Sequence, residues 1–562
     1  MQYLPKLWVR SALLCASVLI VTSCKHGVDI KGQGRVVSLT GSHSCEKAEA
    51  PCRFDVIGAY SETYTAIASA GWLHDSWELC GNGATGKTCT FNIDAASVKK
   101  FEGKSIPSVT ARFRRPIEPL FPITNGIAQL PDTAAARQFK WIMGELTLSS
   151  TSLSTIRDHF STDEYTASEF QSMLQSIRSS IPNAKTIAMV AATPNVVQAI
   201  IGNPNDAENG SWIEVFTGYG PDGQIIELDI YPATDYFEGS GPGYSNLSLQ
   251  GLTSKFSTLA NTSGLLVARI DNDSCKPLAQ YKAKDPQPAG SMFNLWVMGA
   301  LDQAIDDGRI AATAMVPLSA DELVDIGETI NTEPLGTQFP LSELAALMMA
   351  GDDPTASEHI HKLVGRNHIE KTVKQFKHKN SALMYPVLSW NEQLHLLGSV
   401  TPQQANDFAA ASETSQREFA NSTLEPLGSS SGFNARNKEV YFNHTGQASP
   451  FDICAAIAGM RKFDNRSEAF RLLDQAMGAR AGFFGGTFDP WDRVWVTLGV
   501  HGVTDETLSA LNISVLVESD ARGAYVVALM LNDENGINFE GTLVGEVEHV
   551  VTRAVEIISE GL

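Results

Sequence analysis

The stretch that most constrains the fold is Pro288–Leu301, in which a turn of small residues leads into a serine and then into an apolar run. Residues 288–290 read Pro-Ala-Gly, Ser291 follows, and residues 292–301 are apolar or small apart from Asn294. Prolines and glycines mark turns, and a continuous apolar run of this length favours a helix. The pattern predicts a serine exposed at the start of an apolar helix.

This stretch resembles the nucleophile helix of the class A β-lactamase and penicillin-binding-protein superfamily, whose signature there is S-x-x-K. Three further segments resemble the helices around that family's second motif, namely Glu333–Thr337, Leu341–Ala345 and His361–Arg366. Two strands, a block of helices, more strands and a last helix follow the family's order; they are expected at Gly264–Ile270, Gln280–Ala283, Val494–Val500, Leu511–Glu518, Tyr525–Leu531 and Leu543–Glu560. The resemblance implies a β-lactamase-type helix and antiparallel-sheet domain over residues 245–562.

The resemblance also assigns roles to three positions in the first two motifs. Ser291 matches the nucleophile, but Asn294 stands where the family has a lysine, and an amide has no lone pair that accepts a proton. The second motif is S-D-N in the family, and ungapped counting through residues 348–356 puts Asp352 in the serine place. A shift by one residue would put Gly351 there instead. In either alignment the hydroxyl that shuttles the proton is missing.

The third motif, K-T-G or K-G-G, has three candidate stretches. We expect it at residues 481–487, where Phe484 replaces the lysine and Gly485 and Gly486 are kept, at the start of a strand expected over Gly482–Phe488. The alternatives are His444-Thr445-Gly446, which comes early in the chain order, and His501-Gly502-Val503, which comes late.

Two functions follow from these replacements. One is a β-lactamase-related serine hydrolase acting on a small acyl or lactam substrate, with β-lactam hydrolysis in doubt. The other is a pseudoenzyme that binds peptidoglycan-like or protein ligands at the cell envelope. A third arrangement would join Ser291, His501 and Asp352 in a Ser-His-Asp set.

Several other acidic and histidine residues are weaker candidates for a catalytic or metal-binding role. Glu392 lies in the interval where class A enzymes carry an acid that activates water, although a surface glutamate explains it better. Glu358, His359 and His361 lack the H-E-x-x-H spacing, so we interpret them as residues on a helix surface. No metal and no cofactor are expected.

The N-terminus has the pattern of a targeting segment. Lys6 and Arg10 precede a short apolar run, and Val21-Thr22-Ser23-Cys24 resembles a lipobox. We expect a lipoprotein signal peptide over residues 1–24, acylation of Cys24, and a tether over residues 25–34. An ordinary secretory signal is the alternative. Lys25 after the anchor suggests the periplasmic face of the outer membrane, so the lipid bilayer is an expected partner.

Net charge and cysteine spacing limit the possible partners and predict the state of the cysteines. The formal charge of −21 disfavours a nucleic-acid partner, because such binding needs a basic footprint. In an oxidising compartment the close pairs Cys45/Cys52 and Cys80/Cys89 predict two local disulfides, with a four-cysteine zinc site as the alternative. Cys275 and Cys454 are isolated and are expected to be free thiols.

The fold class expected for the 562 residues is a multidomain α+β protein. Short β-branched runs predict a small disulfide-bonded β domain over residues 35–116, with Trp72 and Trp77 in its core. A proline-rich linker over residues 117–134 follows. Helical periodicity and then strand-like runs over residues 135–235 resemble an NTF2-like α+β cone, in which a turn at Gly220–Gly223 joins the last two strands. The β-lactamase-like domain completes the chain.

Overall fold

The computed structural model describes residues 24–80, 84–101, 104–161, 165–218, 223–272, 274–327, 330–430, 435–504, 507–538 and 541–561, without the side chains of residues 85, 208, 501–509 and 534–542. The signal peptide expected before Cys24 and the turn at residues 219–222 lie outside these ranges. The chain divides into two compact units, residues 1–116 and 117–562. Within the described ranges, no helix is long and apolar enough to cross a membrane.

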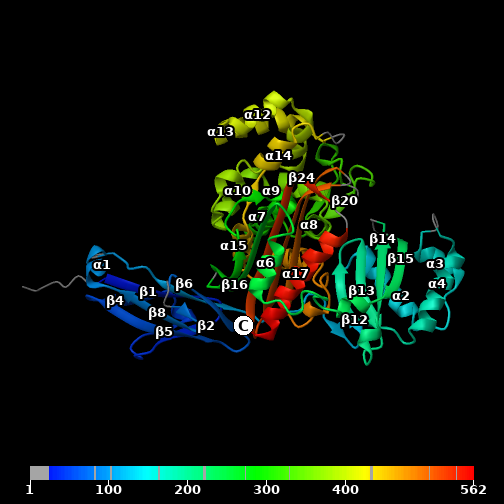
Figure 1. Ribbon diagram of the computed structural model, residues 1–562. Helices are drawn as coiled ribbons and strands as arrows, with labels where there is room; N and C mark the ends of the chain where they lie inside the picture. The colour runs from blue at the N-terminus through cyan, green and yellow to red at the C-terminus, as the bar shows by residue number, and fades with distance from the viewer. Residues whose placement is uncertain are drawn as a thin grey trace, which may run out of the picture. The chain divides into compact units, whose positions relative to one another are not determined.

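The first unit is a β domain made of two sheets (Figure 1). The strand orders are β4-β1-β9-β6 and β3-β2-β5-β8-β7. Its elements are β1 Cys24–Lys31, β2 Gly34–Ser38, β3 Ser44–Glu46, β4 Cys52–Val56, β5 Tyr60–Ala68, β6 Leu73–Glu78, β7 Ala84–Thr85, β8 Thr88–Ile93, α1 Ala95–Lys100 and β9 Val109–Arg114. Trp77 is 2% exposed in the core between them, whereas Trp72 is only partly buried and stacks under Arg115.

The prediction of a tether over residues 25–34 is wrong. Most of this segment is β1, which pairs antiparallel with β4 and parallel with β9. The reason lies in its alternation, because His26, Val28 and Ile30 all point into the β domain and are at most 1% exposed. This period of two is the pattern of a strand with one buried face.

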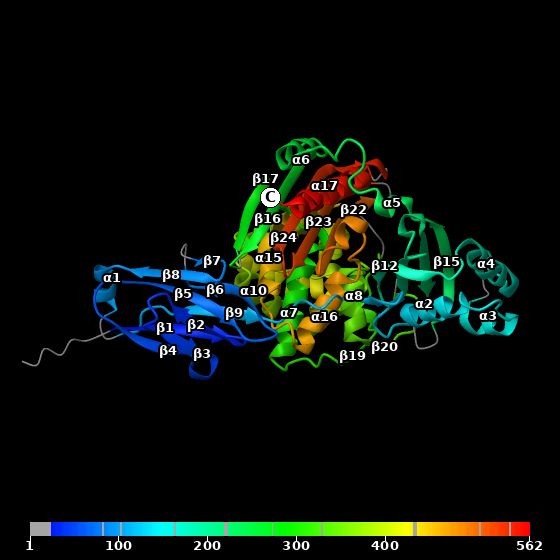
Figure 2. The same ribbon diagram turned by 90° about the horizontal axis from the view of Figure 1, so that it is seen from below.

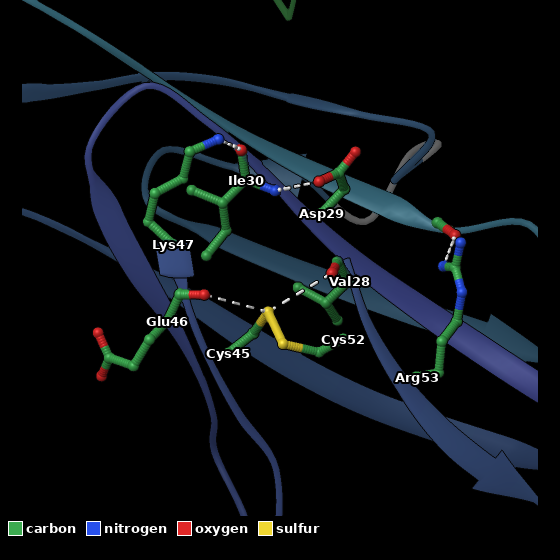
Figure 3. Close-up of a disulfide and its surroundings, with 9 residues drawn as sticks. Val28, Asp29, Ile30, Cys45, Glu46, Lys47, Cys52 and Arg53 are labelled. Carbon is green, nitrogen blue, oxygen red and sulfur yellow. Dashed lines mark hydrogen bonds between the residues drawn. A yellow bond between two sulfur atoms is a disulfide. The ribbon is translucent and has the colours of Figure 1, made fainter. Parts of the chain in front are cut away.

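Both predicted local disulfides are present, Cys45–Cys52 and Cys80–Cys89. Figure 3 shows the first of them beside β1, where the ammonium of Lys47 donates a hydrogen bond to the carbonyl of Ile30 at 2.6 Å. A domain of this size has a thin core, and such crosslinks add stability that the core does not supply.

The part of the second unit near residues 135–235 has three helices followed by an antiparallel sheet, which is the expected order. The helices and strands are α2 Ala134–Glu145, α3 Leu153–His159, α4 Ala167–Ser180, β12 Lys185–Ala192, β13 Val196–Gly202, β14 Ser211–Thr217 and β15 Ile225–Pro232. The strands pair in chain order, and the three helices share one hydrophobic core with the sheet. Part of the expected linker is a small hairpin, β10 Ile123–Thr124 with β11 Ile127–Ala128, whose Gly126 carbonyl accepts the amide of Thr186. The NTF2-like name remains a prediction.

The C-terminal domain is built on a five-stranded antiparallel sheet with the order β17-β16-β24-β23-β22. Its strands are β16 Thr262–Asp271, β17 Ser274–Tyr281, β22 Arg493–Thr504, β23 Thr507–Ser519 and β24 Gly523–Asn538. Alternate residues of β16 lie in two different hydrophobic cores, one on each face of the sheet. Leu265 and Val267 pack toward α6 Leu249–Phe256 and α17 Gly541–Glu560. Leu266 packs toward α7 Asn294–Asp306 on the other face. Figure 2 shows α6 and α17 on one side of the sheet and α7 and its neighbours on the other.

The helical lobe lies between β17 and β22 in the chain. Its remaining elements are β18 Gln287–Pro288, β19 Met315–Pro317, β20 Gln338–Pro340, α8 Leu341–Met349, α9 Pro354–Val364, α10 Arg366–Gln375, α11 Trp390–Leu394, α12 Pro402–Ala410, α13 Glu413–Phe419, α14 Lys438–His444, β21 Gln447–Ala448, α15 Pro450–Met460 and α16 Glu468–Gly478. The apolar helix predicted after Ser291 is α7, at the centre of the lobe.

The prediction that Cys275 and Cys454 are free thiols is wrong. They form a disulfide that joins β17 to α15, with a Cα–Cα distance of 6.3 Å across a sequence separation of 179 residues. Sequence spacing gave no sign of this bond, because folding alone brings the two elements together.

Candidate functional site

Ser291 lies in a short 3₁₀ turn, Gly290–Phe293, directly before α7. The turn begins with Gly290 at φ +56°, a conformation that side chains rarely adopt. Asn512 of β23 holds the turn from behind, since its amide nitrogen donates to the carbonyls of Pro288 and Ala289 at 3.0 and 2.9 Å. Sequence reasoning missed this residue; an asparagine within an apolar strand run was the available signal.

The serine is buried, contrary to the prediction that it is exposed. Ser291 is 1% exposed, and its hydroxyl has two partners within the protein. It donates to Oδ2 of Asp352 at 3.1 Å and accepts the backbone N–H of Val500 at 3.1 Å. The physical reason for the burial is the close packing of the turn against β22, where a Cβ on Gly499 would lie 2.3 Å from Cγ of Met292.

Asp352 lies beside Ser291, as ungapped counting predicts. The next two residues explain its position: Asp353 is the N-cap of α9 and accepts the amide of Ala356 at 2.8 Å, and Pro354 takes the first helical position. This start of the helix leaves Asp352 just outside it, at φ +51°, with its carboxyl toward Ser291. The hydroxyl of the family's second motif is missing here, but the carboxylate of Asp352 can accept a proton.

Burial raises the pKa of Asp352 to about 7, and the nearby Asp353 adds to the rise. The hydrogen bond from Ser291 and the positive charge of Arg480 oppose it. Burial in turn lowers the pKa of the Arg480 guanidinium, while Asp352 raises it. Ser291, Asp352 and Arg480 thus form one electrostatic group.

Asn294 does not take part in this group. Its side-chain oxygen accepts a hydrogen bond from the hydroxyl of Ser357 at 2.6 Å, which links α7 to α9, and the residue is 2% exposed. The amine that the resemblance places three residues after the nucleophile is replaced by an interhelical hydrogen bond.

The third motif is not at Phe484, Gly485 and Gly486, so this prediction is wrong. The expected strand over Gly482–Phe488 is a set of turns with a short 3₁₀ helix, Gly486–Phe488. This segment packs against the α+β domain: the amide of Gly482 donates to Val190 at 3.0 Å, and a Cβ on Gly485 would lie 2.8 Å from the carbonyl of Tyr236. The lack of a side chain at Gly485 allows this close contact.

The strand that faces Ser291 is β22, and its residues nearest the serine are Gly499 and Val500. Between Arg493 and Val500 it contains no lysine. The late candidate His501-Gly502-Val503 follows on the same strand, but the His501 side chain lies outside the described part of the structure, so the Ser-His-Asp arrangement remains a prediction. The early candidate, His444-Thr445-Gly446, lies at the C-terminal end of α14. There the carbonyl of Gly446 accepts a hydrogen bond from the amide of Ala289.

The remaining acidic and histidine candidates are structural. The surface position preferred for Glu392 is wrong, because it is 1% exposed, caps α11 with Ser389 and pairs with Arg366. The surface position expected for Glu358, His359 and His361 is wrong: they are 1%, 2% and 3% exposed, because α9 is enclosed within the lobe. No group of metal-binding side chains is present among the described residues.

The sequence of the C-terminal domain also matches a known family. Residues 249–435 match the family described as "Beta-lactamase enzyme family". The C-terminal domain is β-lactamase-like. The expected fold class, a multidomain α+β protein that contains this domain, is therefore confirmed.

Several solved structures are similar to this β-lactamase-like domain. A β-lactamase from Chitinophaga pinensis is 16% identical, covering 55% of this chain and 98% of that one with a TM-score of 0.38. A β-lactamase from Sphaerobacter thermophilus is 12% identical, covering 55% and 97% with a TM-score of 0.38. The structure of PBP-A is 15% identical, covering 56% and 96% with a TM-score of 0.37. Similarity at this level assigns no role to any residue. The comparison with curated proteins found no match.

Proposed function

We propose that the β-lactamase-like domain is a pseudoenzyme that binds a ligand at the cell envelope and does not turn over β-lactams. The observation that supports this most is the state of Ser291, which is buried and has both hydrogen bonds satisfied by Asp352 and Val500. Acyl transfer needs a nucleophile within about 3 Å of a carbonyl carbon and free N–H donors for the oxyanion. Here the N–H of Val500 is already bound to the serine itself.

The residues that stand in place of the family's lysines support the same proposal. A lysine at position 294 would accept the proton of the serine, but the amide of Asn294 cannot, and its oxygen is engaged by Ser357. β22 also offers no lysine before Val500 to attract a substrate carboxylate. Peptidoglycan-like or protein ligands are the expected partners of such a binding domain.

The test is labelling of the purified protein with a fluorescent penicillin and a fluorophosphonate between about pH 5 and pH 9, with the Ser291→Ala variant as the matched control. We expect equal background signal for both proteins and no turnover of a chromogenic cephalosporin. Labelling that is lost in Ser291→Ala, or rapid cephalosporin turnover, would refute the proposal.

A second candidate is slow acyl transfer by Ser291 with Asp352 as the base. It is favoured by the 3.1 Å hydrogen bond between them and by a carboxyl whose pKa is raised to about 7, near the pH at which a general base works best. Under this mechanism the labelling rate would rise as the pH passes 7 and would be lost in Asp352→Asn. No dependence on either change would exclude it.

We also propose that Cys24 is acylated and anchors the protein on the periplasmic face of the outer membrane. In the structure Cys24 is a free thiol, 2% exposed, that lies 3.4 Å from the carbonyl of Val98. Acylation therefore requires this side chain to leave its place in a small core with Val56 and Ile106. Incorporation of a palmitate analogue into the wild type but not into Cys24→Ala would support the anchor, and equal incorporation would contradict it.

A further inference from the structure

The helical lobe contains a cavity of about 380 Å³ whose wall contains three arginines. Arg309, Arg366 and Arg417 line it together with His368, and no aspartate or glutamate does. In a chain with a formal charge of −21, a pocket lined by three arginines is not explained by overall composition. None of the residues of the Ser291 site lines it.

Three segments that are distant in sequence bring these arginines together. Arg309 follows α7 in a turn at Gly308, which has φ +69°. Arg366 is the first residue of α10, directly after Gly365, which ends α9 at φ +84°. Arg417 lies in the last turn of α13.

Two of the arginines are held in place by carboxylates that do not line the cavity. Arg417 donates to both carboxylate oxygens of Glu370, at 3.0 and 2.8 Å, and to Glu413 at 2.9 Å. Arg366 pairs with the buried Glu392 through Nη2, while its Nη1 is buried and has no hydrogen-bond partner among the described residues. A buried donor without a partner costs free energy, so the guanidinium of Arg366 is only partly satisfied within the protein.

The third arginine has no competing partner. Arg309 is exposed, and within the described ranges its guanidinium forms no ion pair. The cavity wall also includes Gly365 and the first residues of α10, a helix of ten residues that begins without a side-chain cap. Its first N–H groups therefore add donors and the positive end of a helix dipole.

We propose that this cavity binds the phosphate group of a small phosphate monoester. Guanidinium groups recognise phosphate with paired hydrogen bonds, and the unpaired guanidinium of Arg309 can form them. Arg366 and Arg417 are held by carboxylates and add positive charge beside it. The volume matches the lower end of small-ligand sites. A soluble phosphate ester and a lipid phosphate headgroup share this chemistry, and the exposed Arg309 marks the open side from which either would enter.

The experiment measures binding to the full chain by isothermal titration calorimetry at constant ionic strength. The probes are glycerol phosphate, inorganic phosphate, sodium chloride and vesicles that contain phosphatidic acid. We expect glycerol phosphate to bind and chloride to give no specific heat. Binding to vesicles but not to glycerol phosphate would assign the site to a lipid headgroup and would overturn the small-ester form of the proposal.

Variants then locate the binding site. Arg309→Glu should weaken glycerol phosphate binding by about tenfold or more, because it replaces an attractive charge with a repulsive one. It breaks no ion pair, so folding should be unaffected. The matched control is Arg35→Glu in the β domain, where an exposed arginine lies 3.7 Å from an exposed glutamate; it should bind like the wild type.

Two more variants keep the result interpretable. Arg366→Lys keeps a positive charge beside Glu392 but loses the guanidinium fork, and it should weaken binding by a smaller factor. Ser291→Ala should bind phosphate like the wild type, so this proposal can fail or succeed independently of the pseudoenzyme proposal. Unchanged affinity in Arg309→Glu, or no binding of any phosphate probe by the wild type, would overturn it.

Discussion

Replacing Asp352 with asparagine tests whether its carboxyl is as strongly perturbed as the structure indicates. The two side chains have nearly the same shape, and asparagine tolerates the left-handed backbone that residue 352 adopts at φ +51°. The variant can keep a hydrogen bond to Ser291 but cannot ionise. It therefore removes the titration of one group and leaves the local geometry in place.

The direction of the pKa shift determines whether the free energy of unfolding rises or falls with pH. Burial raises the pKa of Asp352 from 3.8 to about 7, so between these values the unfolded chain releases a proton that the folded protein keeps. The wild type thus loses stability as the pH rises from about 4 to about 7, and the loss is complete above that range. Between pH 5 and pH 8, linkage gives a loss of about 2 to 3 kcal/mol from this group alone.

The assay is urea unfolding of the wild type and Asp352→Asn at pH 5 and pH 8, followed by tryptophan fluorescence. Other titrating groups contribute equally to both proteins, so they cancel in the double difference. We expect the stability of Asp352→Asn relative to the wild type to increase by about 2 to 3 kcal/mol between pH 5 and pH 8. The same difference at both pH values would show that the carboxyl titrates normally, and the reasoning about its burial would be wrong.

Two further predictions concern the packing of the C-terminal domain. Replacing Cys275 and Cys454 with serine should lower the free energy of unfolding by up to about 5 kcal/mol, because the disulfide closes a loop of 179 residues; a urea titration of the oxidised protein measures this, and a loss below about 1 kcal/mol would contradict it. Gly499→Ala should cost about 1 to 3 kcal/mol through the contact of the new Cβ with Met292, detected as a lower Tm. An unchanged Tm would mean that the turn before α7 yields easily.

Local signals in the sequence predicted much of the fold. The apolar run after Ser291 became α7, the strand-like runs became β16, β22, β23 and β24, and the last periodic segment became α17. Asp352 could be placed because Asp353 and Pro354 form a helix start with a fixed geometry. These features depend on neighbours in the chain, which sequence patterns record well.

Features that depend on distant contacts could not be predicted in this way. Cys275 and Cys454 meet only because α15 packs beside β17. The glycines at 485 and 486 matched the letters of a motif, whereas the strand facing the serine is recognised only by the hydrogen bond from Val500. The burial of Ser291 likewise follows from how tightly its turn meets β22.

β22 is an edge strand of the five-stranded sheet, so the hydrogen bond between Ser291 and Val500 also affects whether another chain can pair with this edge. Edge strands expose unpaired backbone groups that can recruit another extended chain. At Val500 a side-chain hydroxyl occupies one of these groups. A peptide that adds a sixth strand here would have to displace the Ser291 hydroxyl first. The Ser291 hydroxyl thereby covers one backbone donor at the edge of the sheet.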